Sequence, residues 1–219
     1  MKKKMRWITA AVMAAAMMAM SGCGGTSDTE NTTADTEGTT AQYTVGIIQQ
    51  LEHNALDEAT RGFQDTLKEK LGDQVAFDYQ NAQGEQTNCA TIATKFVSDG
   101  KDLIMANGTT ALQAAAAATG DIPIVGTSVT DFVTAGVVES NEAPGYNVTG
   151  VSDLAPVDQQ IAILRQVVPD AQKVAILYCS AEPNSAFQSE LAQAELDAAN
   201  IEWEEFTAAD SNEIQAVIT

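Results

Sequence analysis

Polar residues that could bind a small charged molecule gather in five short segments of the sequence. Each segment follows a run of apolar, often β-branched residues, so we expect each to lie at the carboxyl end of a strand. The segments are QQLEH (49–53), NGTT (107–110), SVTD (128–131), SD (152–153) and CSAEPNS (179–185). Several of them also open a helix, whose free backbone N–H groups attract anions, and their carboxylates can pair with a cation. The chemistry indicated is the binding of charged groups on a small ligand.

Motifs for catalysis or for cofactor binding are missing from the sequence. It holds no G-x-G-x-x-G, no Walker A loop and no G-x-S-x-G elbow. A Ser-His-Asp hydrolase would have to use His53, the single histidine, which follows the first strand without a nucleophile motif to serve. Its three cysteines show neither C-x-x-C nor His spacing. We therefore predict a binding protein without enzyme activity, metal or cofactor; the competing enzyme hypothesis would make His53 essential for turnover.

Composition and charge narrow the class of protein further. The 219 residues include 45% apolar and 19% charged side chains, which is typical of a globular chain. With 11 basic and 30 acidic residues the formal net charge is −19, which argues against a nucleic-acid partner because phosphate contacts need clustered Lys and Arg. The length allows one large domain or two small ones.

The amino terminus has the pattern of a secretory signal. Lys2, Lys3, Lys4 and Arg6 precede an uncharged apolar run over 7–20, which is too short for a membrane span. The run ends in Met-Ser-Gly-Cys, and residues 1–22 followed by Cys23 resemble a bacterial lipoprotein signal, although Met20 stands where Leu is usual. The resemblance implies that Cys23 is acylated and becomes the mature amino terminus, anchoring the protein on the outer face of the cell membrane. The alternative is a plain secretory signal.

Residues 23–42 are expected to form a flexible tether. After Cys23 this stretch holds no aromatic residue and no aliphatic side chain larger than Ala, so it cannot offset the entropy of ordering.

Strands and helices alternate regularly from residue 43 onward. Strands are predicted over 43–48, 75–80, 102–107 and 122–128, separated by helices that end before Gly72, at Gly100 and at residue 118. Strands joined by helices of this length predict right-handed βαβ units and a mostly parallel sheet. This N-terminal α/β lobe is assigned to residues 43–150.

A second series is expected over 151–219, led in by a strand at 148–153. A helix opens at Pro156, a favoured first helical position, followed by a strand at 173–179, a helix at 184–199 and a strand at 201–206. Asp210 is predicted to cap a last helix. A sheet with so few strands and helices cannot have both of its faces buried, so we expect this second lobe to be incomplete. We therefore expect the chain to be a fragment that lacks roughly another hundred residues.

Several motifs resemble those of one known family. YTVGIIQQLEHNALDEATRGFQDTL, ANGTTALQAAAAAT, DIPIVGTSVTDF, NVTGVSD and LYCSAEPNS are similar to the substrate-binding lipoproteins of ABC importers, in particular the tryptophan or tyrosine binders. The similarity covers essentially all of 43–219. It implies a type I periplasmic-binding-protein fold, in which two hinged α/β lobes close on a ligand.

The resemblance also implies a set of ligand-binding residues. The first lobe would contribute Gln50, Glu52, His53, Leu56, Thr109, Thr110, Thr130 and Asp131, and the second Ser152, Asp153, Asn184 and Ser185. Phe132 stands where many relatives have Pro after the Thr-Asp pair, which affects the turn expected there. Cys89, within a helix, and Cys179, at a strand end, fall in different lobes and are expected to be free, buried thiols.

The function implied is capture of a small molecule for an ABC permease and its ATPase. An aromatic amino acid is favoured, with its carboxylate at the Thr109–Thr110 helix start and its ammonium on Asp153 or, as second choice, Asp131. Its side chain would point toward Gln50, His53 and Leu56. A purine-nucleoside or sugar binder, and a receptor lipoprotein that presents its ligand to a sensor, remain alternatives.

Overall fold

The computed structural model describes residues 41–218 of the chain. The predicted signal peptide, Cys23 and residues 24–40 of the predicted tether lie outside the described residues. Within residues 41–218, no helix is long and apolar enough to cross a membrane.

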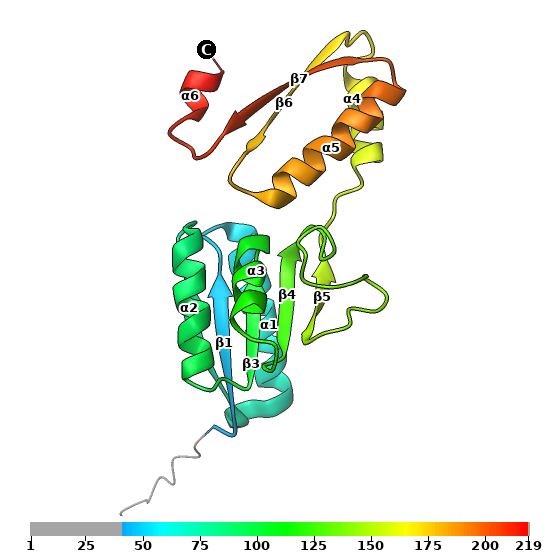
Figure 1. The fold of residues 1–219 in the computed structure, drawn as a ribbon. Helices are drawn as coiled ribbons and strands as arrows, with labels where there is room; N and C mark the ends of the chain where they lie inside the picture. The colour runs from blue at the N-terminus through cyan, green and yellow to red at the C-terminus, as the bar shows by residue number, and fades with distance from the viewer. Residues whose placement is uncertain (1–40, 219) are drawn as a thin grey trace, which may run out of the picture. The chain divides into compact units, whose positions relative to one another are not determined.

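Five parallel strands form the larger sheet, in the order β2-β1-β3-β4-β5. These strands are β1 (Tyr43–Gln49), β2 (Val75–Asn81), β3 (Leu103–Asn107), β4 (Ile124–Val129) and β5 (Val148–Ser152). Three helices connect the first four strands: α1 (Asn54–Leu71), which a short 3-10 turn (Gly72–Gln74) follows, α2 (Gln86–Ser98) and α3 (Thr109–Ala118). The predicted α/β class, with a parallel sheet flanked by helices, is confirmed (Figure 1).

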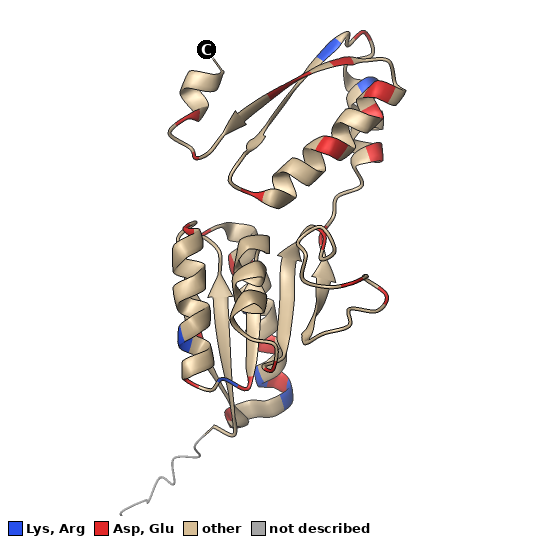
Figure 2. Ribbon diagram, viewed as in Figure 1, with Lys and Arg blue, Asp and Glu red and all other residues tan. Residues whose placement is uncertain are grey.

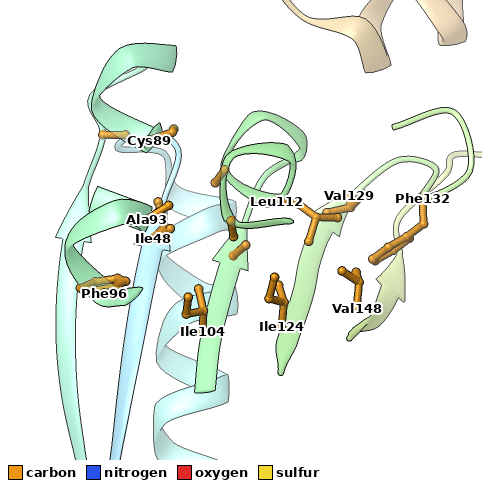
Figure 3. Close-up of a cluster of buried hydrophobic side chains, with 14 of the residues drawn as sticks. Ile48, Cys89, Ala93, Phe96, Ile104, Leu112, Ile124, Val129, Phe132 and Val148 are labelled. Atoms are coloured by element: carbon orange, nitrogen blue, oxygen red, sulfur yellow. The ribbon is translucent and has the colours of Figure 1, made fainter. Parts of the chain in front are cut away.

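Helices cover this sheet on both faces, which is why β1 is buried along most of its length. Side chains on one face, such as Val45 and Ile47, pack with Phe63 and Leu67 of α1. The opposite face packs against α2 and α3 and forms the larger apolar cluster (Figure 3). Because all five strands run in the same direction, their carboxyl ends meet at one edge of the sheet.

The strand at 148–152 belongs to the first sheet, whereas the sequence placed it at the head of the second series. β5 pairs with β4 from Ile124↔Val148 to Gly126↔Gly150 and again at Val129↔Ser152. The close fit depends on glycines, because a Cβ at Gly150 would lie 2.2 Å from the Gly126 carbonyl oxygen. Phe132 is buried in the apolar cluster (Figure 3). Its ring packs over both glycines. Ser152 therefore ends a strand of the first sheet, and the division at 150/151 stays a prediction.

A second parallel pair consists of β6 (Lys173–Cys179) and β7 (Glu202–Ala208), with helix α5 (Pro183–Ala198) packed on both strands. Helix α4 (Val157–Val167) contacts α5 and leaves Ile163 and Val167 exposed. Three helix starts differ from prediction, the first being α5, which begins at Pro183 and not at residue 184. Pro156 is the residue before α4, not its first residue. Asp210 accepts a hydrogen bond from the Asn212 N–H, and this tight turn delays the last helix, α6 (Ile214–Val217), by several residues.

The two cysteines among the described residues, Cys89 and Cys179, are free thiols, as predicted. Cys89 is fully buried in α2, and burial raises the pKa of its thiol. Cys179 is only half-buried, which differs from the prediction, because it ends β6 and its Sγ donates to the Ala209 carbonyl at 3.3 Å.

Basic residues gather at the edge of the larger sheet opposite the strand carboxyl ends (Figure 2). Lys95 at the end of α2 and Lys101 before β3 each place Nζ 3.0 Å from Asp78 Oδ2. Gln80 Nε2 donates to the other oxygen of Asp78 at 2.7 Å. This hydrogen bond from Gln80, together with the two lysines, lowers the pKa of Asp78 from 3.8 to about 2.

Replacing this aspartate by asparagine is expected to destabilise the fold at neutral pH. Because the pKa of Asp78 is depressed on folding, its contribution is present above about 3.8 and is lost as the pH falls towards 2. For a partly exposed group we expect Asp78→Asn to lower the free energy of unfolding by about 1–2 kcal/mol at pH 7. Urea unfolding at pH 7 and at pH values below 4 measures the difference, which should shrink in acid. Asp65→Asn, on the exposed face of α1, is the control; a difference that persisted unchanged in acid would contradict this account.

Candidate ligand-binding pocket

A small pocket of about 230 Å³ lies at the carboxyl ends of β1, β3 and β4. The chain comes to it from the β1–α1 turn, from the start of α3, from β4 and from the start of α5. Its lining consists of Gln50, Leu51, His53, Leu56, Gly108, Thr109, Ser128, Glu182 and Asn184. The volume suits a small molecule and not a macromolecule.

Gln50 is the central polar side chain of the pocket. It is 7% exposed, and its backbone N–H donates to the Asn107 carbonyl at 2.9 Å. Its side-chain oxygen accepts the Thr110 N–H at 3.1 Å, which satisfies one of the free N–H groups at the start of α3. Its Nε2 donates to Glu182 Oε1 at 3.1 Å. The Gln50 amide thus joins the amino terminus of α3 to a carboxylate at the start of α5.

Glycine is required directly beneath this amide. Gly108 has φ 112°, which side chains rarely adopt, and a Cβ there would lie 2.5 Å from Gln50 Oε1. The open space at Gly108 therefore lets Gln50 reach α3.

Two fully buried amides hold the β1–α1 turn in place. Gln49 Nε2 donates to the Leu51 carbonyl at 3.0 Å, and Asn107 Nδ2 donates to the Leu56 carbonyl at 2.7 Å. Both amides also bond to the Thr60 hydroxyl, at 2.8 Å and 2.9 Å. Since these bonds fix backbone on both sides of His53, they position the part of the turn that lines the pocket.

His53 caps α1 and lies at the pocket. Its Nδ1 accepts the Ala55 N–H at 3.2 Å, so the neutral ring carries its proton on Nε2. That leaves Nε2–H as a donor for a polar group of a ligand.

The backbone at Ser128 is strained. Its φ of 53° is uncommon for a residue other than glycine, and it falls where the register between β4 and β5 shifts, between Gly126 and Val129. This irregularity lies at the lining of the pocket, in keeping with the tendency of strained backbone to mark binding sites.

Five of the twelve predicted site residues line this pocket. They are Gln50, His53, Leu56, Thr109 and Asn184. Two more contact lining residues without lining the pocket themselves. Thr110 donates its N–H to Gln50, and the Ser185 hydroxyl donates to Glu182 Oε2 at 3.1 Å.

The structure places the other five elsewhere. Glu52 lines a separate hollow with Asp57 and Tyr79. Thr130 is buried, and its carbonyl accepts the Ser152 hydroxyl at 2.6 Å.

Both aspartates proposed for the ligand's ammonium are among these five residues that lie elsewhere. Asp131 accepts the Thr134 N–H at 2.6 Å, which lowers the pKa of Asp131 and uses one of its oxygens as a turn cap. Asp153 is exposed, and its backbone N–H donates to the Val129 carbonyl at 3.0 Å.

Four lining residues were missed from the sequence: Leu51, Gly108, Ser128 and Glu182. All four lie inside the polar segments at the strand ends, so their positions in those segments were the available signal. Glu182 is moreover the acidic residue of the CSAEPNS segment (179–185).

Comparison with known proteins identifies the family. The family model described as "ABC transporter substrate binding protein" matches residues 44–219. The chain belongs to this family. The type I periplasmic-binding-protein fold is likewise confirmed, because solved structures of that class match it: a conserved domain protein from Vibrio cholerae has a TM-score of 0.77 and 36% identity, over 80% of this chain and 60% of that one.

Two further relatives of this substrate-binding chain have names that state a ligand. A "Tyrosine-binding protein" of Clostridioides difficile (strain R20291) is 45% identical over 150 residues, covering 67% of this chain and 44% of that protein. A Streptococcus ABC domain solved in complex with L-Trp has a TM-score of 0.77 and 35% identity, over 81% of this chain and 61% of that one. The chain thus spans less than two thirds of the length of each of these relatives.

Proposed function

We propose that the protein is the extracytoplasmic solute-binding component of an ABC importer and that it captures an aromatic amino acid. The observation that carries this proposal is the pocket at the strand carboxyl ends, built from the β1–α1 turn, the start of α3 and the start of α5. Family membership supports the transport role, and the relatives named for tyrosine and solved with L-Trp support the ligand.

The lining offers a partner for each part of such a ligand. Of the nine described residues around the pocket, none is Lys or Arg, so a ligand carboxylate would depend on N–H and hydroxyl donors. The start of α3 supplies both, with the Thr109 hydroxyl and those first-turn backbone N–H groups that Gln50 does not hold. Leu51 and Leu56 supply apolar surface for an aromatic ring. The Nε2–H of His53 can donate a hydrogen bond to a polar group at the edge of that ring.

The proposal includes no catalytic step. The protein acts by binding its ligand selectively. Binding is coupled to closure of the lobes, and the ligand is then delivered to a permease with its ATPase. In this proposal His53 serves as a helix cap and a ligand contact.

A lipid anchor at Cys23 forms part of the same proposal. The leader over 1–22 and the small residues before Cys23 support processing as a lipoprotein. Acylation with two or more fatty-acid chains, palmitate among them, would hold the protein stably at the outer face of the membrane.

Isothermal titration calorimetry with amino acids, purine nucleosides and sugars tests the ligand class. We expect saturable binding of L-tryptophan, L-tyrosine or L-phenylalanine, with no heat of binding from nucleosides or sugars. Binding of a nucleoside or a sugar alone would overturn the ligand assignment and leave the transport role in place.

A further inference from the structure

Glu182 is the anionic group of the pocket. It immediately precedes α5, is half-buried, and its backbone carbonyl accepts the Ser185 N–H at 3.1 Å. Each of its carboxylate oxygens has one neutral donor: Oε1 accepts from Gln50 Nε2 at 3.1 Å and Oε2 from the Ser185 hydroxyl at 3.1 Å. These bonds orient the carboxylate without neutralising it.

No other carboxylate and no Lys or Arg stands among the described residues that line this pocket. A carboxylate has about four lone-pair sites, so Glu182 can accept further hydrogen bonds beyond the two it has. A cation entering the pocket would therefore find one charged partner, Glu182.

The hydrogen bonds of the Gln50 amide show which side of the pocket donates hydrogen bonds and which side accepts them. Its oxygen faces the Thr110 N–H, and its NH₂ group faces the Glu182 carboxylate. One small planar group thus presents an acceptor to α3 and a donor to Glu182. An α-amino acid has the same arrangement, with its carboxylate as the acceptor and its ammonium as the donor.

We propose that Glu182 binds the α-ammonium group of the ligand and makes binding depend on the presence of that group. This inference rests on the proposed function, because it takes the ligand to be an amino acid. Glu182 is then a specificity-determining residue that rejects carboxylates of the same shape lacking the amino group, since its charge would be left without a cation.

Binding of matched ligand pairs to the Glu182→Gln protein tests this role. Glutamine keeps the size of the side chain and an oxygen to accept from Gln50, but removes the charge. The pairs are L-tryptophan with 3-(indol-3-yl)propanoate and L-tyrosine with 3-(4-hydroxyphenyl)propanoate, which differ only in the amino group. We expect the variant to lose tenfold or more in affinity for the amino acid and to bind the amino-free analogue as well as, or better than, the wild type.

Glu190→Gln is the matched control, because Glu190 is exposed on the same helix and its replacement changes the net charge equally. It should bind both ligands of a pair as the wild type does. Asp153→Asn should do the same, since Asp153 lies outside the pocket lining.

Two results would overturn the role of Glu182 alone. The first is a Glu182→Gln protein whose affinity for both members of a pair is unchanged, or falls by the same factor for both. The second is an Asp153→Asn protein that loses affinity for the amino acid but not for its amino-free analogue. A wild-type protein that bound neither aromatic amino acid would instead overturn the proposed function, and the Glu182 assignment with it.

Discussion

The protein is expected to lose about a hundredfold in ligand affinity when Gly108 is replaced by alanine. The residue has φ 112°, and a Cβ there would lie 2.5 Å from Gln50 Oε1 and 2.8 Å from Gln50 Cβ. Gln50 is 7% exposed and is bonded to Thr110 and Glu182, so it cannot move aside without breaking the arrangement of the pocket. The strained backbone should also lower the free energy of unfolding by about 1–3 kcal/mol.

Calorimetry with an aromatic amino acid and urea unfolding measure the two effects of Gly108→Ala. Gly62→Ala is the matched control, because Gly62 lies within α1 and a Cβ there would meet nothing within 4 Å. This control should bind normally and be more stable by about 0.5–1 kcal/mol, as expected for alanine in a helix. Wild-type affinity in Gly108→Ala would show that the ligand does not depend on the Gln50–α3 contact.

Replacing Cys23 by alanine is expected to release the protein from the membrane. Each buried methylene of an acyl chain contributes about 0.8 kcal/mol of membrane affinity, so two or more chains account for nearly all of the anchoring. Fractionation of cells should find wild-type protein with the membranes and Cys23→Ala in the soluble fraction, without the added mass of the lipid.

Ser21→Ala is the control for processing, because it keeps a small residue before the intact cysteine. It should remain with the membranes. Cys23→Ala protein that stayed in the membrane fraction as the wild type does would rule out the lipoprotein anchor.

The order of strands and helices could be predicted from the sequence because each element carries a local signal. A short continuous run of apolar, β-branched residues marks strands such as Tyr43–Gln49, and Gly72 and Gly100 stop the helices before them. Strand pairing has no such local signal. β5 was assigned to the second series because it follows a break in the rhythm, whereas its place beside β4 depends on the contact of Gly150 with Gly126.

The location of the site was predictable from the parallel arrangement of the strands, but the individual contacts were not. Strands of one parallel sheet bring their carboxyl ends together whatever the side chains are, so Gln50, His53 and Thr109 of the larger sheet do meet at one pocket. Which acid of a polar segment faces the pocket depends on turn geometry. Asp131 has an oxygen engaged as a turn cap, while Glu182 reaches the pocket because it directly precedes α5 and is held by Gln50.

The central claim is that the pocket takes an aromatic amino acid, and mass spectrometry of the protein's own cargo tests it most directly. Protein purified from its native cells without added ligand is denatured, and the released small molecules are identified and quantified. We predict L-tryptophan, L-tyrosine or L-phenylalanine in an amount approaching one per protein molecule, reduced strongly in Gly108→Ala. A nucleoside or a sugar released at that ratio, with no aromatic amino acid, would contradict the account.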